Sequence, residues 1–369
     1  MNNADKIKFG LIGCGRISVN HIAAVLAHSS SYSINALCDI VPARIDAILD
    51  QIPADLRSNV SLYHNYHEML SNEDINLVSI CTESGKHASI GLDVIKSKKH
   101  VLIEKPMALS IADTDELIRS SRENNVILYP CHQNRFNKSI QKVREALDQG
   151  RLGSLMHGTA HIRWNRGKNY YDQAPWRGTW EQDGGALMNQ CLHNIDLLRW
   201  LMGNDIDEVF AYTDNKMHPF IEAEDIGIAL IKFKNGSYGV IEGTTNVFPE
   251  NLEETLYLFG QKGTVKVGGK SVNLIEEWRF GDKMDNPEQV KKEFGENPPN
   301  VYGFGHTPLY EDLASAIRYG SKPYISGEDG KRAVELILAI YKSAKEGKLV
   351  KFPLEDFSTM DMKGFFNGI

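Results

Sequence analysis

The sequence predicts an α/β protein of two domains. The N-terminal domain is built on a parallel β-sheet, and the C-terminal α+β domain on an open, mainly antiparallel sheet. Three observations predict this fold class: strand and helix patterns alternate over the first third of the chain, hairpin turns join the strands that follow, and 369 residues exceed one typical domain. We therefore divide the chain into residues 1–130 and residues 131–369.

The first domain alternates buried strands with helices. Short apolar runs predict strands at Ile7–Ile12, Ile34–Cys38, Leu77–Cys81, Val101–Ile103 and Val126–Tyr129. Helical patterns lie between them at Val41–Gln51, His87–Lys98 and Ser110–Asn124. Ser110 followed by Asp113 resembles a capping box, which marks a helix start. Strands that alternate with helices form a parallel sheet covered on both faces.

The second domain has a different pattern. A helix is expected at Asn137–Gln149, and strands follow at Leu155–Arg163, Glu208–Thr213, Ile226–Phe233, Tyr238–Thr245, Thr255–Phe259 and Thr264–Val267. The pairs Asn235-Gly236 and Gly268-Gly269 are hairpin signals, so this sheet should be largely antiparallel. Two more helices are expected, one from about Gly185 to Met202 and one at Glu328–Lys345, and the polar stretch Asp282–Asn300 is expected to be a surface excursion. An open sheet face commonly needs a partner, so we expect a homodimer or homotetramer formed through it.

Composition excludes several classes of protein. The chain is 42% hydrophobic and 24% charged, which argues against disorder, and its net charge of −7 with no basic stripe argues against nucleic acid as a partner. Its five cysteines form no Cys-x-x-Cys pair, so we expect buried thiols in a reducing cytoplasm and no metal site. Met1–Asp5 lacks the features of a signal peptide, and no apolar run approaches the ~20 residues that span a bilayer.

A glycine loop follows the first strand. Gly13 and Gly15 occupy the first two positions of a Gly-x-Gly-x-x-Gly loop, and Ser18 stands at the third. The first glycine permits the tight turn, the second lets the backbone approach a pyrophosphate, and the following helix offers its N-terminus to the phosphates. Asp39 ends the second strand, where a carboxylate accepts hydrogen bonds from the adenosine ribose and repels a 2′-phosphate. The sequence therefore predicts a Rossmann domain that binds NAD rather than NADP.

The stretch from Lys99 to Pro106, which contains Glu104-Lys105-Pro106, resembles the signature of the glucose–fructose oxidoreductase / inositol dehydrogenase / rhizopine catabolism (Gfo/Idh/MocA) family. The glycine loop, Cys81-Thr82, and Gly184–Leu187 before a helix carrying His193 extend this resemblance over nearly the whole chain. It implies an NAD-dependent dehydrogenase with catalytic Lys105 and His193. The implied cofactor-binding residues are Gly13, Gly15, Arg16, Ile17, Asp39, Thr82, His87, Glu104 and Lys105.

Oxidation of a secondary alcohol needs a hydride acceptor, a base for the hydroxyl proton and a cation for the developing alkoxide. We assign His193 as the proton acceptor and Lys105 as the hydrogen-bonding cation, and the reverse assignment stays open. One position departs from the commonest family pattern, which has Asp four residues before the histidine. That residue is Asn189. On one helix the two would share a face, but Asn cannot ionise and can only orient by hydrogen bonding.

Several segments resemble a narrower, sugar-nucleotide branch of the family: Asn169–Tyr171, Trp176–Trp180, Met188–Gln190 and Pro298–His306. This resemblance implies NAD-dependent oxidation of a ring hydroxyl, at C3, of a UDP-N-acetylhexosaminuronate in the synthesis of surface polysaccharide such as lipopolysaccharide. Tryptophans and tyrosines interleaved with arginines suit a sugar ring, a carboxylate or a pyrophosphate. The expected substrate-binding residues are Lys105, Arg163, Asn165, Arg166, Tyr171, Arg177, Asn189, His193 and His306.

Other interpretations stay open at this point. The three arginines can equally form surface ion pairs, and His306 can equally cap a helix that begins near Pro308. A polyol or free-sugar dehydrogenase, such as one acting on inositol, is the alternative within enzymes. A regulator that senses NAD or sugar without catalysis is the alternative of another class.

Overall fold

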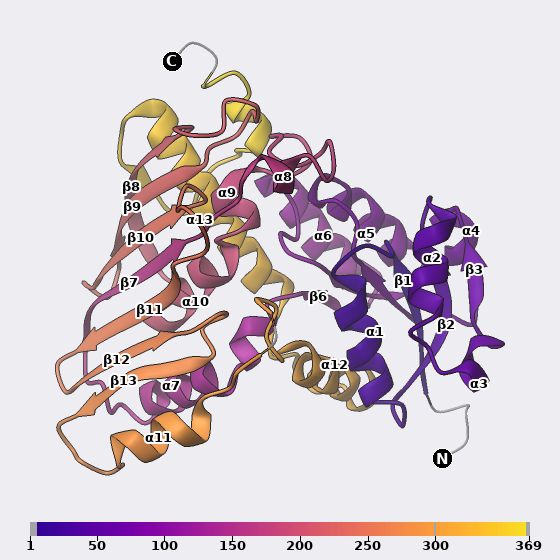
Figure 1. Ribbon diagram of the computed structural model, residues 1–369, viewed down its shortest axis with the longest axis horizontal. Helices are drawn as coiled ribbons and strands as arrows, with labels where there is room; N and C mark the ends of the chain where they lie inside the picture. The colour runs from indigo at the N-terminus through magenta and orange to yellow at the C-terminus, as the bar shows by residue number, and fades with distance from the viewer. Residues whose placement is uncertain (1–5, 299, 367–369) are drawn as a thin grey trace. The chain divides into compact units, whose positions relative to one another are not determined.

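A computed structural model describes residues 6–298 and 300–366 of the chain (Figure 1). Met1–Asp5, on which the expectation about a signal peptide rests, and Pro299 of the Pro298–His306 segment lie outside the described residues. The chain forms two compact units, one of Met1–Cys131 with His306–Lys331 and one of His132–Gly305 with Arg332–Ile369.

The N-terminal unit contains a six-stranded parallel sheet in the order β3-β2-β1-β4-β5-β6. The strands are β1 Ile7–Ile12, β2 Tyr32–Cys38, β3 Ser61–Tyr63, β4 Leu77–Ile80, β5 His100–Ile103 and β6 Leu128–Pro130. The order reverses between β1 and β4, and in such sheets ligands bind beyond the carboxyl ends of the strands at this switch point. The predicted Rossmann sheet is confirmed, with β3 as an additional edge strand that its short, exposed sequence did not reveal.

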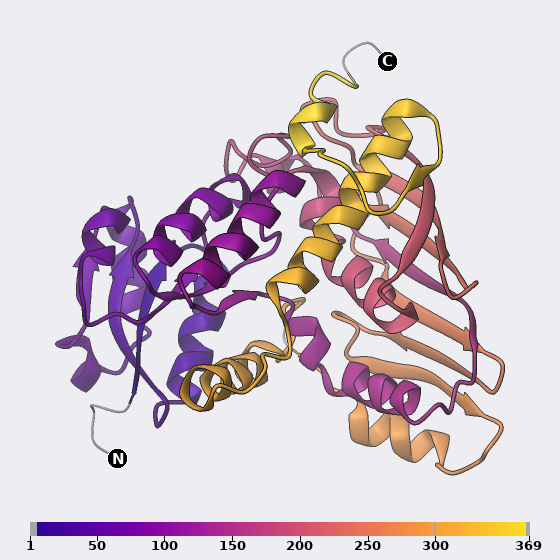
Figure 2. The same cartoon turned by 180° about the vertical axis from the view of Figure 1, so that it is seen from behind.

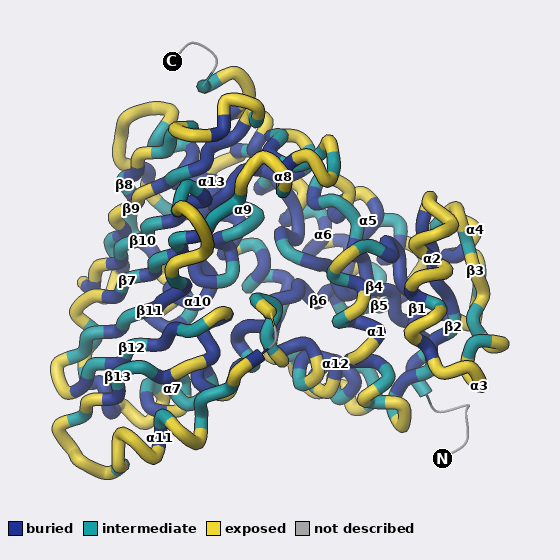
Figure 3. Tube along the Cα trace, in the orientation of Figure 1, coloured by how far each residue is buried: buried dark blue, intermediate teal, exposed yellow. Residues whose placement is uncertain are grey.

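The helices of this unit follow the strands in turn. They are α1 Ser18–Ala27, α2 Pro42–Leu49, α3 Ala54–Arg57, α4 Tyr66–Leu70, α5 His87–Lys96, α6 Ile111–Glu123 and α12 His306–Tyr319, with a 3₁₀ turn η2 at Ser84–Lys86. Ser110 caps α6 by accepting a hydrogen bond from the amide of Asp113, as the sequence predicts. The residues of β4 and most of β5 are buried (Figure 3), and Val78, Ile80, Val101 and Ile103 pack with α5 and α6 in a hydrophobic core cluster.

One segment lies in a different unit from the one that the sequence indicates. Residues 306–331 fall in the predicted C-terminal domain of 131–369, but they pack with the N-terminal unit. The reason is the apolar face of α12, whose Tyr310 is buried and packs edge-to-face against Phe9 of β1 and Tyr32 of β2. The helix therefore completes the side of the parallel sheet on which α1 lies.

The C-terminal unit contains an eight-stranded sheet in the order β13-β12-β11-β7-β10-β9-β8-β14. The strands are β7 Leu155–Arg163, β8 Ile206–Asp214, β9 Ile226–Phe233, β10 Tyr238–Thr244, β11 Glu253–Gly260, β12 Gly263–Gly268, β13 Leu274–Phe280 and β14 Val350–Lys351. All neighbouring pairs are antiparallel except β7 with β10. The prediction of a mainly antiparallel sheet is confirmed.

Helices cover one face of this sheet, with α10 and α13 running along it in both views (Figures 1 and 2). The helices are α7 Lys138–Asp148, α8 Lys168–Tyr171, α9 Gly185–Asn189, α10 Leu192–Met202, α11 Pro287–Phe294 and α13 Gly327–Glu346, with 3₁₀ turns η3 Gln133–Phe136 and η4 Thr359–Met362. On the other face, β8, β9 and β10 alternate buried with exposed residues, and Tyr212, Ile228, Leu230 and Tyr238 are exposed. We call this second face the exposed sheet face.

One expectation about elements was wrong, and one segment contains a helix that was not expected. The helix expected from Gly185 to Met202 is two helices, because the amides of both Gln190 and Cys191 bond to the carbonyl of Ala186 and break the regular pattern. The expected excursion at Asp282–Asn300 contains helix α11, which buries Val290 and is capped by Asn286. Among the described residues, no helix is long and apolar enough to cross a membrane.

Candidate active site

The glycine loop joins β1 to α1 at the carboxyl end of the sheet. Gly13 adopts φ +92°, and a Cβ there would lie 2.7 Å from the backbone of Cys81, so only glycine fits. At Gly15 a Cβ would meet nothing within 4 Å, which leaves the backbone open to an approaching ligand. Ser18 is buried and its hydroxyl donates to the carbonyl of Gly15. These features fit the pyrophosphate of a dinucleotide at the N-terminus of α1.

Asp39 is tied to the same loop. One carboxylate oxygen accepts the amide of Cys14 at 2.8 Å, and the other accepts the amide of Val41 at 2.8 Å. Each oxygen keeps a further lone pair for a ribose hydroxyl. The carboxylate thus stands where a ribose would be recognised, beside exposed Ile40.

The next two strands end at the other predicted cofactor residues. Thr82 follows β4, and His87 is buried, with Nδ1 2.7 Å from the carbonyl oxygen of Pro106 and Nε2 3.1 Å from that of Thr82. His87 therefore ties the segment after β4 to the segment after β5, and both of its nitrogens are engaged by protein. Arg16 is exposed and Ile17 immediately precedes α1.

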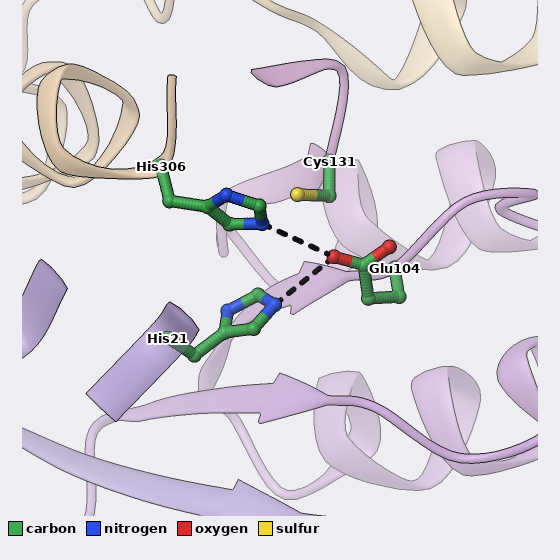
Figure 4. Close-up of side chains that lie close together, drawn as sticks. All are labelled: His21, Glu104, Cys131 and His306. Carbon is green, nitrogen blue, oxygen red and sulfur yellow. Dashed lines mark hydrogen bonds and ion pairs between the residues drawn. The ribbon is translucent and has the colours of Figure 1, made fainter. Parts of the chain in front are cut away.

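Lys105 follows β5 and is half-buried, and its amide donates to the Oε2 atom of Glu104 at 3.1 Å. Glu104 itself is buried with His21, Cys131 and His306 (Figure 4). These four ligand atoms lie within 4.8 Å of one another, and their donor set could hold a metal ion. Direct hydrogen bonding of His21 Nε2 to Glu104 Oε1 at 3.0 Å already satisfies the carboxylate, so we interpret the cluster as a hydrogen-bonded network.

In the C-terminal unit, His193 lies in the first turn of α10. Its Nε2 atom is 3.1 Å from the side-chain nitrogen of Gln133 in η3. One turn further on, Asp196 accepts two hydrogen bonds from Arg135 at 2.8 and 2.7 Å and one from Arg199 at 2.7 Å. Burial would raise the pKa of Asp196, but Arg135, His132 and Arg199 hold it well below its usual range. This buried ion network fixes the helix that carries His193.

Glu224 holds the start of α9. It is fully buried, and one carboxylate oxygen accepts the amide of Leu187 at 2.7 Å and the hydroxyl of Tyr341 at 2.7 Å. Burial raises the pKa of Glu224 to about 8. Gly185, at φ +92°, leaves the space that the carboxylate fills, because a Cβ there would lie 1.7 Å from its Oε2 atom.

Asn189 ends α9 and lines a pocket together with Tyr170, Tyr171, Gly178, Asp183, Gly185, Ala186, Gln190 and Ile221. Its side-chain amide donates to the carboxylate of Asp183, and its side-chain oxygen accepts from Gln190 at 2.6 Å. Asp183 is buried and also accepts the amide of Gly178 at 2.7 Å. The break after α9 separates Asn189 from His193, so the expectation that they share one helix face was wrong.

Two predicted arginines flank the ring of Tyr170 beside this pocket. Arg166 lies over the rings of Trp164 and Tyr170 and donates to the Gln190 side chain at 2.8 Å. Arg177 lies 4.3 Å from the Tyr170 ring centroid and donates to its hydroxyl. Neither guanidinium has a carboxylate within 4 Å among the described residues, and burial lowers the pKa of Arg166. Two cations without a direct carboxylate partner suit an anionic ligand.

The other predicted substrate residues divide into two groups. Asn165 bridges to the segment after β10, and Tyr171 lines the pocket with its hydroxyl 3.4 Å from that of Thr245. Arg163 instead lies on the exposed sheet face, where Glu242 and Glu253 neutralise it. His306 is buried in the N-terminal unit with its ring edge-to-face to His21.

Sequence reasoning did not include Asp183, Glu224, Glu254 or His21 among the site residues. Asp183 precedes the Gly184-Gly185 pair by one residue, and His21 lies on the buried side of α1, but neither position has a spacing that predicts its partner. Glu254 on β11 is buried, its Oε2 atom has no hydrogen-bond partner among the described residues, and burial raises its pKa to about 8. Buried acids of this kind are indistinguishable from surface acids in a single sequence.

Comparison with known proteins agrees with this geometry. Residues 7–132 match the model of the oxidoreductase family NAD-binding Rossmann fold, and residues 144–352 match that of the oxidoreductase family C-terminal alpha/beta domain, both of Gfo/Idh/MocA. The WlbA dehydrogenase from Bordetella pertussis, solved with NADH and UDP-GlcNAcA, is 36% identical over 96% of this chain and 100% of its own, with a TM-score of 0.88.

Two further relatives indicate the range of similar proteins. The WlbA enzyme from Chromobacterium violaceum, also solved with NADH and UDP-GlcNAcA, is 34% identical over 96% of this chain and 98% of its own, with a TM-score of 0.86. Myo-inositol 2-dehydrogenase from Thermotoga maritima is 26% identical over 94% of this chain and 98% of its own.

The Rossmann sheet, its glycine loop and the strand-end Asp39 define an NAD-dependent oxidoreductase. The chain belongs to the Gfo/Idh/MocA oxidoreductase family.

Proposed function

We propose that this oxidoreductase is a sugar-nucleotide dehydrogenase that oxidises the C3 hydroxyl of a UDP-N-acetylhexosaminuronate with NAD. The observation that carries the proposal is the pair Arg166 and Arg177, two guanidinium groups around Tyr170 with no carboxylate partner among the described residues. A sugar nucleotide brings a pyrophosphate, and a hexuronate adds a carboxylate, so this substrate supplies the missing negative charge. The similarity to two dehydrogenases solved with UDP-GlcNAcA supports the same substrate class.

Substrate binding in this proposal uses Lys105, Asn165, Arg166, Tyr171, Arg177, Asn189 and His193. Arg163 and His306 are left out because other side chains of the protein engage them. Asn189 is held between Asp183 and Gln190, so its amide group has one fixed orientation toward the pocket. Cofactor binding uses Gly13, Gly15, Arg16, Ile17, Asp39, Thr82 and Lys105, while His87 and Glu104 act through the segments that they hold.

The reaction breaks two bonds of the substrate. NAD, when bound, accepts the hydride from the carbon that carries the hydroxyl. His193 takes the hydroxyl proton, and the Lys105 ammonium donates a hydrogen bond to the oxygen while negative charge develops on it. The products are the ketone, NADH and a protonated His193, which returns its proton to solvent. In the structure the Gln133 amide donates to His193 Nε2, and the substrate hydroxyl takes the place of this donor when it binds.

The proposal is tested with purified protein, NAD and a panel of substrates: UDP-GlcNAcA, UDP-GlcNAc without the carboxylate, and myo-inositol. We expect NADH formation and a keto product with UDP-GlcNAcA alone. A 2-oxo acid acceptor is added in parallel, so that NADH which stays bound is reoxidised and turnover remains visible. Absence of turnover with every sugar nucleotide would refute the substrate class.

The polyol alternative is favoured by the 26% identity to a myo-inositol dehydrogenase. It predicts turnover of inositol without any nucleotide. The regulator alternative is tested by Lys105→Ala, which should abolish turnover and leave NAD binding intact if the protein is an enzyme. We further propose that the enzyme is a homodimer or homotetramer formed through the exposed sheet face, and that it works in the cytoplasmic steps of surface-polysaccharide synthesis, such as that of lipopolysaccharide.

A further inference from the structure

The buried network behind Lys105 joins three segments that are far apart in the sequence. His21 comes from α1, Glu104 from the end of β5 and His306 from the start of α12. The relative exposures of the three residues are 0%, 6% and 4%, so water has almost no access to them. Figure 4 shows both imidazole rings directed at the same carboxylate oxygen of Glu104.

Both carboxylate oxygens of Glu104 make contacts in this network. Oε1 lies 3.0 Å from His21 Nε2 and 3.7 Å from His306 Nε2, and Oε2 accepts the amide of Lys105. His21 is fixed at its other nitrogen, with Nδ1 2.8 Å from the hydroxyl of Tyr310 and 3.1 Å from that of Ser79. The carboxylate is therefore held rigidly on one side and holds the Lys105 backbone on the other.

The charge of the network is balanced. Burial would raise the pKa of Glu104, but His21 and His306 hold it well below its usual range. Burial would lower the pKa of His21, but the charges and hydrogen bonds of Cys81 and Glu104 outweigh it and raise the pKa to about 10. Burial lowers the pKa of His306. At neutral pH the network then consists of one carboxylate, one imidazolium and one neutral imidazole. The other titratable groups that face it are Cys81, Cys131, His87 and Tyr310.

We propose that Glu104, with His21 and His306, is the positioning group of Lys105: it fixes the backbone from which the lysine projects and keeps the charge behind the lysine neutral. The inference rests on the proposed catalytic role of Lys105. An unpaired carboxylate at this position would raise the pKa of Lys105 and so change the pH range over which the lysine is an ammonium. The His21 imidazolium removes that effect, while the hydrogen bond from Lys105 to Glu104 is kept.

The test separates the two functions of Glu104 by substitution. Glu104→Gln keeps an oxygen that accepts the Lys105 amide and an amide that donates to neutral His21, so we expect kcat within about threefold of the native value. Glu104→Ala removes the acceptor, and we expect kcat to fall about 100-fold with the substrate KM and the NAD affinity nearly unchanged. The matched control is Lys99→Met, which deletes a buried polar group hydrogen-bonded to Asn72 and Ile75 at the start of β5.

The charge balance of the network is tested by the pH dependence of kcat. His21→Gln leaves Glu104 without its counter-charge, and we expect the alkaline limb of the kcat–pH profile, where Lys105 loses its proton, to move about one unit to higher pH. In the double variant His21→Gln/Glu104→Gln both substituted side chains are neutral, so the kcat–pH profile should return to its native position. A profile that does not move in His21→Gln, or a kcat for Glu104→Ala no lower than that of Lys99→Met, would overturn the proposal.

Two parallel measurements distinguish failure of the proposed function from failure of the positioning role of Glu104. If Lys105→Ala keeps its turnover, the catalytic role of Lys105 fails, whatever Glu104 does. If Lys105→Ala is inactive and Glu104→Ala is as active as its control, only the positioning role fails. The ¹⁵N NMR signal of His21, assigned by its loss in His21→Gln, needs no substrate. It should report an imidazolium at pH 8 in the native protein and a neutral ring in Glu104→Gln.

Discussion

At the scale of single residues, the sequence did not predict that the carboxylate of Asp183 lies next to Asn189. The commonest family pattern has Asp at this position. Here the amide of Asn189 donates to Asp183, which also holds the amide of Gly178. The pocket therefore retains one negative charge, placed six residues earlier in the chain. The sequence comparison alone suggested that the charge had been lost.

The first prediction exchanges these two residues. Asn189→Asp places two carboxylates in contact, which raises the pKa of one of them and breaks the hydrogen bond, so we expect kcat/KM to fall at least about tenfold. Asp183→Asn should be similarly impaired, because an amide has one oxygen where the carboxylate has two, so one of the two donors loses its acceptor. Steady-state kinetics with UDP-GlcNAcA measure both effects.

The reciprocal double variant Asp183→Asn/Asn189→Asp is the control. It restores one carboxylate and one amide in contact, and we expect it to recover most of the activity that each single variant loses. If kcat/KM of the double variant falls by as much as the two single losses combined, then Asp183 and Asn189 do not act as a pair.

The second prediction concerns the arginines beside Tyr170. Arg177→Leu removes one guanidinium from beside Tyr170, and we expect the KM for UDP-GlcNAcA to rise about 10- to 100-fold with the NAD affinity unchanged. Arg279→Leu is the matched control, because Arg279 is exposed on β13 and pairs with Glu277. An unchanged KM in Arg177→Leu would remove this arginine from the substrate site.

At the scale of elements, β11 carries a buried acid that makes stability depend on pH. Burial raises the pKa of Glu254 to about 8. In the unfolded chain this group ionises near its ordinary pKa, so between the two values the unfolded state loses a proton that the folded state keeps. Stability from this group is therefore present below about pH 4.5 and falls as the pH rises toward 8.

The third prediction follows from this behaviour. Glu254→Gln cannot ionise, so the variant should be as stable as the native protein at pH 5 and more stable by about 1–3 kcal/mol at pH 8. Urea denaturation at pH 5, 6.5 and 8 measures the difference. Glu253→Gln, the neighbour on the same strand that pairs with Arg163, is the control and should show no such gain. A difference for Glu254→Gln that does not grow with pH would contradict the pKa.

The elements also show what could be predicted from the sequence. Strands with continuous apolar runs or regular alternation, such as β1, β7 and β9, have the expected bounds, because burial on one or both faces dictates their pattern. The sequence predicted one continuous helix from Gly185 to Met202. The break after α9 was not predictable, since it arises from two amides that share one carbonyl. Helix α11 was missed because it buries a single residue, Val290, and so has no apolar period.

The candidate site was predictable to the same degree. Gly13, Gly15, Asp39 and Lys105 follow strands, and a parallel sheet brings strand ends together. The partners of Glu104 were not predictable, because His21 and His306 meet it only when α1 and α12 pack on the same sheet. Contacts between segments this far apart depend on tertiary packing that a spacing rule does not contain.

At the scale of the whole molecule, no helix among the described residues covers one face of the C-terminal sheet. Tyr212, Ile228, Leu230 and Tyr238 lie in neighbouring strands β8, β9 and β10, and 46% to 70% of each side chain is exposed. Apolar side chains gathered on one face of a monomer are unusual unless a partner covers them. Arg163, Glu242 and Glu253 lie on the same face and add a charged group beside the apolar one. A twofold arrangement of two such faces would bury both groups at once.

The fourth prediction places two charges on this face. Ile228→Glu/Leu230→Glu should convert the proposed homodimer or homotetramer to smaller species, because burying carboxylates without partners opposes association. Light scattering at micromolar concentration measures the mass. Leu56→Glu, a similar change on an exposed side chain of α3 in the N-terminal unit, is the control and should keep the native mass. A native protein that is already monomeric, or a double variant with the mass unchanged, would contradict assembly through this face. Turnover by a dissociated variant would further show whether each subunit holds a complete site.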